Sequence, residues 1–358
     1  MDIKKFSFNR PLGLRDIWGL RAIFSIIFTR LCRPKIIINL LLFLYNGIFK
    51  CEKVSNMPLY LMLEPSSRCN LKCKMCWRTL YKFNRPEGDM PYAEFKEIID
   101  KIGDCLIFVG LWNYGEPLLN PELNKMIAYC SKKGIVTVLS TNGTLLDRAK
   151  SLDLFAAGLK YLIICVDGVT EEVYQEYRNT AKLAEVENNV RQVCDLKKEK
   201  RSKFPVIELQ FIVMKGNEHQ VDEFFPLAYS WGLDRAVLKK VSMLKDIKLA
   251  DDFLPRNGNY LLDCYKNTGK SIPKGFCDIP WQTMVVNSDG WVVPCCSDYF
   301  SLEKTGNVFV DSIDKIWNNN NYIKLRSRMK NDINPLGVCN NCPHHSGHTG
   351  SFISARNF

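Results

Sequence analysis

Residues 69–76 read CNLKCKMC, which places Cys69, Cys73 and Cys76 within a single short loop. The loop directly follows Leu59–Glu64, an apolar run typical of a buried strand. Three soft thiolates at this spacing can each bind one iron of a 4Fe–4S cube and leave the fourth iron without a protein ligand. A structural zinc site is the alternative, but it needs a fourth Cys or His, and none lies close by. The stretch therefore favours an iron–sulfur cluster after the first strand.

Downstream of this loop, strand-like and helix-like segments alternate. The expected strands are 59–64, 105–111, 135–140, 161–166, 206–213 and 235–241, and the helices between them are 92–102, 121–133, 145–157, 171–178, 183–200 and 220–230. This alternation predicts an α/β protein whose parallel sheet curls into a partial (β/α)6 TIM-like barrel. Functional residues of such sheets gather in the loops after the strand carboxyl ends, where the motifs described below also fall.

The composition is that of a globular protein. The 358 residues are 46% hydrophobic and 24% charged, which provides a large core and excludes a disordered chain, a collagen or a coiled coil. The 15 cysteines are too sparse for a disulfide scaffold. Their odd number, with no recognisable cleavable signal, favours a cytoplasmic, reducing compartment in which thiolates remain free to bind metal.

The basic charge is concentrated at the N-terminus. Residues 1–53 hold ten Lys or Arg against three Asp or Glu, so +7 of the net charge of +11 belongs to this segment. Two apolar blocks, 17–28 and 36–49, are each shorter than the roughly 18–20 residues that a membrane-spanning helix needs. The pattern predicts a helical extension over 1–56 that lies in an anionic membrane interface at the inner face of the membrane, packs on the main domain or contacts a protein partner. Nucleic-acid binding is not indicated.

After residue 245 the pattern changes. Residues 283–286 and 291–293 predict a small hairpin, and a helix is expected from Ser312 to Met329. Four cysteines accompany this region, namely Cys277, Cys295, Cys339 and Cys342. Four thiolates fit either a tetrahedral zinc or a fully ligated 4Fe–4S cluster, and their spacing leaves both open. We expect a helical extension at 1–56, a barrel at 57–245 and a cluster-binding domain at 246–358.

Four motifs in order resemble those of the radical S-adenosylmethionine (radical SAM) superfamily. Residues 64–68, EPSSR, with the three cysteines that follow, are similar to its cluster loop, and residues 113–117, NYGEP, are similar to its Gly-Gly-Glu-Pro loop. Residues 140–143, STNG, resemble the segment that binds the cofactor ribose. Asp167 ends the fourth strand, and Arg178 follows in a Tyr-x-x-Tyr-Arg context familiar from this family.

The resemblance implies a 4Fe–4S cluster on Cys69, Cys73 and Cys76 whose open iron holds S-adenosylmethionine. Its reduction would release a 5′-deoxyadenosyl radical that abstracts hydrogen from a substrate, with the electron supplied by a flavodoxin or ferredoxin. The implied cofactor-binding residues are Asn113, Tyr114, Gly115, Glu116, Pro117, Ser140, Thr141, Asn142, Asp167 and Arg178. Tyr114 departs from the family pattern, which has a glycine there.

The C-terminal region resembles the SPASM/twitch domain that follows many radical SAM barrels. This resemblance favours iron–sulfur over zinc at Cys277, Cys295, Cys339 and Cys342. Full SPASM domains continue with further cysteines and hold two clusters, whereas here His348 stands six residues after Cys342 and no cysteine follows. We therefore expect one auxiliary 4Fe–4S cluster, fully ligated, that accepts or relays electrons.

The substrate is the least determined part. The helical N-terminal extension lacks the strand alternation of the leader-binding domains of peptide-modifying relatives, which favours dehydrogenation or epimerisation of a sugar, cyclitol or lipid-linked substrate. Maturation of a peptide or protein is the alternative, and a non-enzymatic iron–sulfur or zinc protein is the alternative of another class. Cys165, at the end of the fourth strand, is a candidate hydrogen donor.

Overall fold

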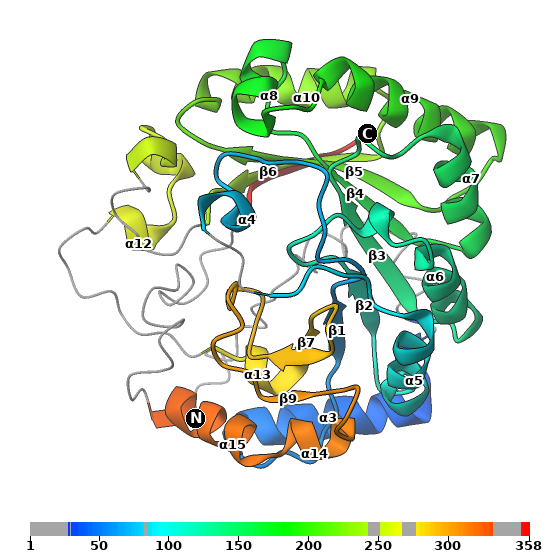
Figure 1. Cartoon of the computed structure of the whole chain (residues 1–358), viewed down its shortest axis with the longest axis vertical. Coiled ribbons are helices and arrows are strands. Elements are labelled where there is room, and N and C mark those ends of the chain that lie inside the picture. The colour runs from blue at the N-terminus through cyan, green and yellow to red at the C-terminus, as the bar shows by residue number, and fades with distance from the viewer. Residues whose placement is uncertain (1–27, 29, 82–84, 243–250, 267–276, 332–351) are drawn as a thin grey trace.

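The computed structural model describes residues 28, 30–81, 85–242, 251–266, 277–331 and 352–358 (Figure 1). The strands of this part of the chain form one sheet in the order β10-β6-β5-β4-β3-β2-β1-β7-β8-β9. Their bounds are β1 Tyr60–Leu63, β2 Phe108–Leu111, β3 Val136–Thr141, β4 Tyr161–Cys165, β5 Val206–Val213, β6 Arg235–Lys240, β7 Thr283–Val286, β8 Trp291–Val293, β9 Gly306–Asn307 and β10 Phe352–Asn357.

Strands β1 to β6 are parallel neighbours in chain order, which confirms the α/β class and the partial barrel. Figure 1 shows helices along the outer, convex side of this curved sheet. The helices between the strands are α4 Trp77–Leu80, α5 Tyr92–Ile102, α6 Leu123–Lys132, α7 Arg148–Ala157, α8 Glu171–Arg178, α9 Leu183–Glu199 and α10 Val221–Ser230. The strands are buried on both faces, so they read as continuous apolar runs.

The C-terminal hairpin belongs to the same sheet as the barrel. Strand β7 pairs with β1 in parallel, with Leu61 opposite Met284, and β8 pairs with β7 in antiparallel fashion. Gly290, at φ +80°, closes the predicted turn between them. Trp281, before the hairpin, and Trp317, after it, belong to the same buried apolar core as the barrel strands. The hairpin therefore lies directly beside the strand that leads into CNLKCKMC.

The prediction of a single helix from Ser312 to Met329 is wrong. Two helices, α14 Ile313–Trp317 and α15 Asn320–Asn331, occupy this segment. The Asn318 side chain between them exchanges hydrogen bonds with the backbone of Val54 at 2.9 and 2.8 Å. Contacts across 264 residues thus interrupt a helix that its local sequence permits.

The tail beyond residue 331 was not expected to contain a strand, yet β10 covers the free edge of β6. The pairing is antiparallel, with Asn357 opposite Arg235. This pairing gives hydrogen-bond partners to backbone N–H and C=O groups that an edge strand would leave unpaired. The alternation of apolar and polar side chains that marks a strand is weak in β10, which has two half-buried and four exposed residues.

The remaining helices are α3 Pro34–Ile48, α12 Asp263–Lys266 and α13 Ile279–Gln282. Helix α3 confirms helical structure for the second apolar block of the N-terminal extension. It lies at the amino-terminal end of the barrel strands, where Asn39 Nδ2 donates to the carbonyl oxygens of Met57 and Cys105 at 3.1 and 3.3 Å. The first block, up to residue 27, lies outside the described residues. Among the described helices none is both long and apolar enough to span a bilayer.

Candidate functional site

The three cysteines of CNLKCKMC lie in the loop between β1 and α4. Cys73 is buried, Cys69 and Cys76 are partly exposed, and Cys76 is the N-cap residue of α4. The Leu71 N–H donates to Cys69 Sγ at 3.5 Å, and Arg178 Nη1 donates to Cys73 Sγ at 3.8 Å. Such donors are suited to sulfur atoms that carry negative charge. Burial raises the pKa of Cys69 to about 11, so metal binding has to displace a proton there.

The described residues contain no group of three Cys, His, Asp or Glu side chains arranged around a point for a single metal ion. A cubane cluster does not need such convergence, because each thiolate binds a different iron. The soft donors, their N–H partners and the cation beside Cys73 fit a 4Fe–4S cluster.

The loop NYGEP packs directly on the cluster loop. A Cβ on Gly115 would lie 1.9 Å from the carbonyl oxygen of Ser66 and 2.7 Å from that of Arg68, so only glycine fits without movement of the loop. The Glu116 N–H donates to the same Arg68 carbonyl at 2.7 Å. The structure thereby brings together two motifs that lie about 45 residues apart in the sequence.

Glu116 joins NYGEP to STNG. Its buried carboxylate accepts hydrogen bonds from Thr141 Oγ1 at 2.7 Å, from the Asn142 N–H at 2.9 Å and from the Leu118 N–H at 3.1 Å. Burial raises the pKa of this carboxyl group above its usual range. Pro117 begins the short helix η2, Pro117–Leu119. Glu116 thus positions the end of β3 relative to the NYGEP loop.

Asn142 in turn contacts the cluster loop. Its Nδ2 donates to Asn70 Oδ1 at 3.0 Å, and Asn70 Nδ2 donates to Thr144 Oγ1 at 2.8 Å. Gly143, at φ +79°, makes the turn that allows both contacts. The first three motifs therefore form one hydrogen-bonded unit at the carboxyl ends of β1, β2 and β3.

Asp167 and Arg178 form a buried ion pair beside Cys73. Arg178 Nη2 also donates to the Cys165 carbonyl at 3.1 Å, and Asp167 Oδ1 accepts from the Ile212 N–H at 2.9 Å. The cation therefore lies between the end of β4 and the cluster loop. The sequence predicts Arg178 as a cofactor-binding residue, and in this structure its guanidinium contacts Cys73.

Cys165 lies at the end of β4, with Sγ 3.6 Å from Ser140 Oγ. Burial raises the pKa of its thiol, so it stays protonated at neutral pH. A protonated thiol is a poor nucleophile but carries a hydrogen atom. Ser140 and Cys165 thus bring together the ends of β3 and β4.

Only half of the second cysteine group lies in the described residues. Cys277 precedes α13 and Cys295 follows β8, and both are partly exposed. The Ser297 N–H donates to Cys295 Sγ at 3.4 Å, and burial raises the pKa of this thiol to about 12. Cys339 and Cys342 lie outside the described residues, as does His348.

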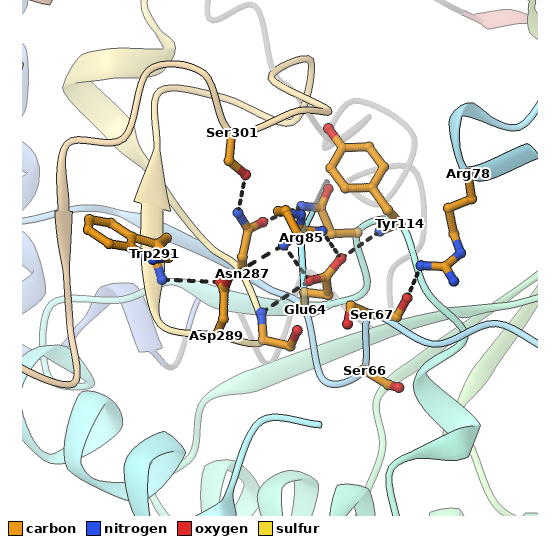
Figure 2. A network of polar contacts seen from close by, with 12 residues as sticks. Glu64, Ser66, Ser67, Arg78, Arg85, Tyr114, Asn287, Asp289, Trp291 and Ser301 are labelled. Atoms are coloured by element: carbon orange, nitrogen blue, oxygen red, sulfur yellow. Dashed lines mark hydrogen bonds and ion pairs between the residues drawn. The ribbon is translucent and has the colours of Figure 1, made fainter. Parts of the chain in front are cut away.

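Glu64 connects the two cysteine regions, and sequence reasoning missed this role (Figure 2). Its fully buried carboxylate pairs with both Nη atoms of Arg85, at 2.9 and 2.8 Å. It also accepts from the Tyr114 N–H at 3.2 Å and from the Ser288 N–H, in the hairpin turn, at 3.1 Å. A carboxylate at the end of an otherwise apolar strand was the available signal.

Two further contacts join the NYGEP loop to the hairpin. Asn113 Nδ2 donates to Asn287 Oδ1 at 3.1 Å. The Tyr114 hydroxyl donates to the carbonyl oxygen of Cys296, next to Cys295. Burial raises the pKa of Tyr114 well above its usual value, so the hydroxyl remains a donor. The residue that departs from the family pattern is thus the one that contacts the second cysteine region.

Aromatic rings fill the space between the two regions. The Tyr299 ring stacks on Trp77, which follows Cys76, with centroids 4.3 Å apart, and lies 5.0 Å from the Tyr114 ring. Trp77 also stacks on Tyr81 at 5.0 Å. Through these ring contacts, Trp77 and Tyr114 pack against the segment after Cys295.

Comparison with known proteins agrees with this arrangement. A model of the radical SAM superfamily matches residues 63–223, and a model of an iron–sulfur cluster-binding domain, SPASM, matches residues 277–343. The chain is 27% identical over 323 residues to a tungsten-containing aldehyde ferredoxin oxidoreductase cofactor-modifying protein of Pyrococcus furiosus, covering 79% of this chain and 86% of that protein. It is 24% identical to the PqqA peptide cyclase of Gluconobacter oxydans, covering 73% and 76%.

The fold is also similar to that of Streptococcus suis SuiB, solved bound to the precursor peptide SuiA. The TM-score is 0.59 at 16% sequence identity, over 84% of this chain and 72% of SuiB. The family models begin at the end of β1 and span all four motifs and the four C-terminal cysteines. The chain therefore belongs to the radical SAM superfamily, carries a C-terminal SPASM iron–sulfur domain, and uses a 4Fe–4S cluster, S-adenosylmethionine and auxiliary iron–sulfur chemistry.

Proposed function

We propose that this radical SAM enzyme modifies a peptide or protein. The relationship to a peptide cyclase over about three quarters of both chains carries this proposal. The similarity to a fold solved with a precursor peptide is consistent with it, as a likeness of fold. We favour this substrate class over the sugar, cyclitol or lipid-linked substrate expected from the sequence. The relative named for cofactor modification supports keeping a non-peptide substrate as the second candidate.

The proposed ligands of the S-adenosylmethionine-binding cluster are Cys69, Cys73 and Cys76. When bound, this cluster and S-adenosylmethionine supply hydrogen-atom abstraction from an unactivated C–H bond. Arg178 donates to Cys73 Sγ and so offsets part of the negative charge that the thiolates bring into a buried loop. Gly115 lets the NYGEP backbone approach the Ser66 and Arg68 carbonyl oxygens just before these cysteines.

The proposed ligands of one auxiliary 4Fe–4S cluster are Cys277, Cys295, Cys339 and Cys342. With four thiolates this cluster has no open iron, so we assign it to electron acceptance or relay. The contacts from Tyr114 and Glu64 to the hairpin support a fixed distance between the two cysteine regions. An external flavodoxin- or ferredoxin-type protein would supply the reducing electron.

Cys165 is proposed as the donor of a hydrogen atom to a substrate radical. Its thiol stays protonated and is partly exposed at the end of β4. If it acts this way, replacement by Ala leaves hydrogen abstraction intact and changes the product. An enzyme that only dehydrogenates would form the same product without this thiol.

The test compares cells that express the wild type with cells that express Cys73→Ala, both lacking any other copy of this chain. Extracted peptides and polar metabolites are compared by mass spectrometry. The proposal expects a wild-type-specific peptide that has lost two hydrogen atoms or has kept its mass with a changed retention time. A wild-type-specific change confined to glycans, lipids or small metabolites would overturn the peptide assignment and leave radical chemistry intact. Absence of 5′-deoxyadenosine in the purified, reduced wild type would favour an electron carrier.

A further inference from the structure

Helix α3 is oriented by its polar side chains. Met57 N–H donates to Asn39 Oδ1 at 2.7 Å, and Asn46 Nδ2 donates to Asn56 Oδ1 at 2.9 Å. Both asparagines are buried, with Ile36 and Phe43 on the same face of the helix. These hydrogen bonds fix the rotation of the helix relative to the barrel, because turning it would leave buried polar groups unpaired.

The opposite face of α3 is apolar and exposed. Residues at helical spacing, namely Ile37, Ile38, Leu41, Tyr45 and Ile48, are 43–60% exposed, and Phe49 follows at 57%. With Phe28 they make up seven of the twelve large, exposed apolar side chains of the described residues. A surface helix normally exposes a polar face, whereas α3 carries apolar side chains on its exposed face as well as Ile36 and Phe43 on its buried one. Such a concentration on and next to one helix marks a surface that binds a partner or a membrane.

Basic residues flank α3 at both ends along the chain, although Arg33 Nη1 donates to the Lys133 carbonyl at 3.0 Å. Arg33 and Lys35 are exposed at the start of the helix, and Lys50 and Lys53 are exposed just after its end. Lys35 is paired with Asp104, and Glu52 is the acidic residue among these flanking positions. The segment 1–53 carries +7 of the net charge of +11. An apolar stripe flanked by cations complements the acyl and headgroup layers of an anionic bilayer.

We propose that the outward face of α3 binds an anionic phospholipid surface, with the helix lying in the plane of the interface. Its 15 residues give a length of about 22 Å, enough to lie along the surface and too short to cross it. The helix lies at the amino-terminal end of the strands, and CNLKCKMC follows the carboxyl end of β1. The cluster loop therefore faces away from the membrane, where peptide and electron donor arrive.

The test is flotation of the reconstituted, full-length protein with vesicles of phosphatidylglycerol and phosphatidylethanolamine. The double variant Ile38→Glu/Leu41→Glu places two carboxylates on the exposed face without touching the buried one. We expect the wild type to float with these vesicles and the variant to lose about tenfold or more of its binding, because each carboxylate removes an apolar contact with the acyl layer and is repelled by the anionic headgroups. Binding should also weaken with added salt and on phosphatidylcholine vesicles.

The matched control is Leu302→Glu/Val310→Glu, which changes two equally apolar side chains that are 69% and 84% exposed elsewhere. It should float like the wild type. Equal flotation of both double variants, or no flotation of the wild type, would overturn the proposal. So would a wild type that forms a dimer in solution, binds no vesicles and becomes monomeric in Ile38→Glu/Leu41→Glu, because the face would then bind a second copy. None of these outcomes depends on the substrate.

Discussion

The two cysteine regions are built in different ways. The first places its three thiols within eight residues of one loop, and the neighbouring motifs hold that loop through Gly115, Asn70 and Arg178. The second draws cysteines from positions 277 to 342, with a hairpin between the first two. A local loop can present thiols as soon as its strand forms. A distributed site requires the tertiary structure to be complete.

The regions are nevertheless not independent. Glu64 accepts hydrogen bonds both from the NYGEP loop and from the hairpin turn. Since β7 is paired to β1, the residues of the second region are built onto the strand that carries the first. A shared sheet and one buried carboxylate thus set the relation between the two cysteine regions.

The largest expected effect is the loss of iron when a cysteine of one region is replaced. We expect about eight irons per chain in the wild type, since each cubane holds four. Cys73→Ala should lose the first cluster and all formation of 5′-deoxyadenosine. Cys295→Ala should lose the second cluster and retain this product. Iron, sulfide and zinc are counted on the same samples. About four irons with one zinc in the wild type would make the second region a structural zinc site.

Removal of the buried carboxylate should affect both regions together. In Glu64→Ala, Arg85 loses a bidentate partner in a buried position. We expect a loss of about 3–5 kcal/mol in the free energy of unfolding, measured by denaturant titration of the anaerobic protein. Arg148→Ala breaks the exposed pair with Glu199 and should cost less than about 1 kcal/mol. Similar losses of unfolding free energy in the two variants would show that Glu64 contributes no more to stability than an exposed ion pair.

Gly115→Ala tests the close approach of the two loops in the first region. The added methyl group meets backbone oxygen atoms at 1.9 and 2.7 Å, so the loops must separate. We expect a loss of about 1–3 kcal/mol in stability and weaker binding of S-adenosylmethionine, measured by calorimetry. Gly88→Ala is the control, because a Cβ there has no heavy atom within 4 Å. If Gly115→Ala binds the cofactor like the wild type, the contact has no role in binding.

The smallest expected effect concerns one hydroxyl. Tyr114→Phe keeps the ring against Tyr299 and removes the hydrogen bond to the Cys296 carbonyl. We expect a stability loss of about 0.5–1.5 kcal/mol. The electron paramagnetic resonance signal of the auxiliary cluster should shift, while that of the first cluster stays unchanged. A change in the signal of the first cluster alone would show that Tyr114 affects that cluster and not the auxiliary one.

Much of the barrel could be predicted because its signals are local. Periodicity predicted β5 over Val206–Val213 and α5 over Tyr92–Ile102 with the observed bounds. The four motifs stand at strand ends, which parallel topology brings to one edge of the sheet. Residues such as Cys69 and Gly115 could thus be assigned to a common site without coordinates.

Other features depend on contacts that no local pattern contains. The break between α14 and α15 requires Val54, and the strand β10 requires the free edge of β6. The apolar residues of α3 predicted a helix, but its buried asparagines decide which face points outward. In each case, a hydrogen bond between distant residues overrides or completes a local preference.

By itself, the sequence determined the parallel α/β barrel, the thiol donors and the order of the cofactor motifs. It could do so because hydrophobic periodicity and short spacing act over a few residues. Only the tertiary structure decided that the hairpin extends the barrel sheet and that Glu64 and Tyr114 connect the two cysteine regions. The physical reason is that a buried carboxylate is stable only where distant donors converge on it, and this convergence exists only in the folded chain.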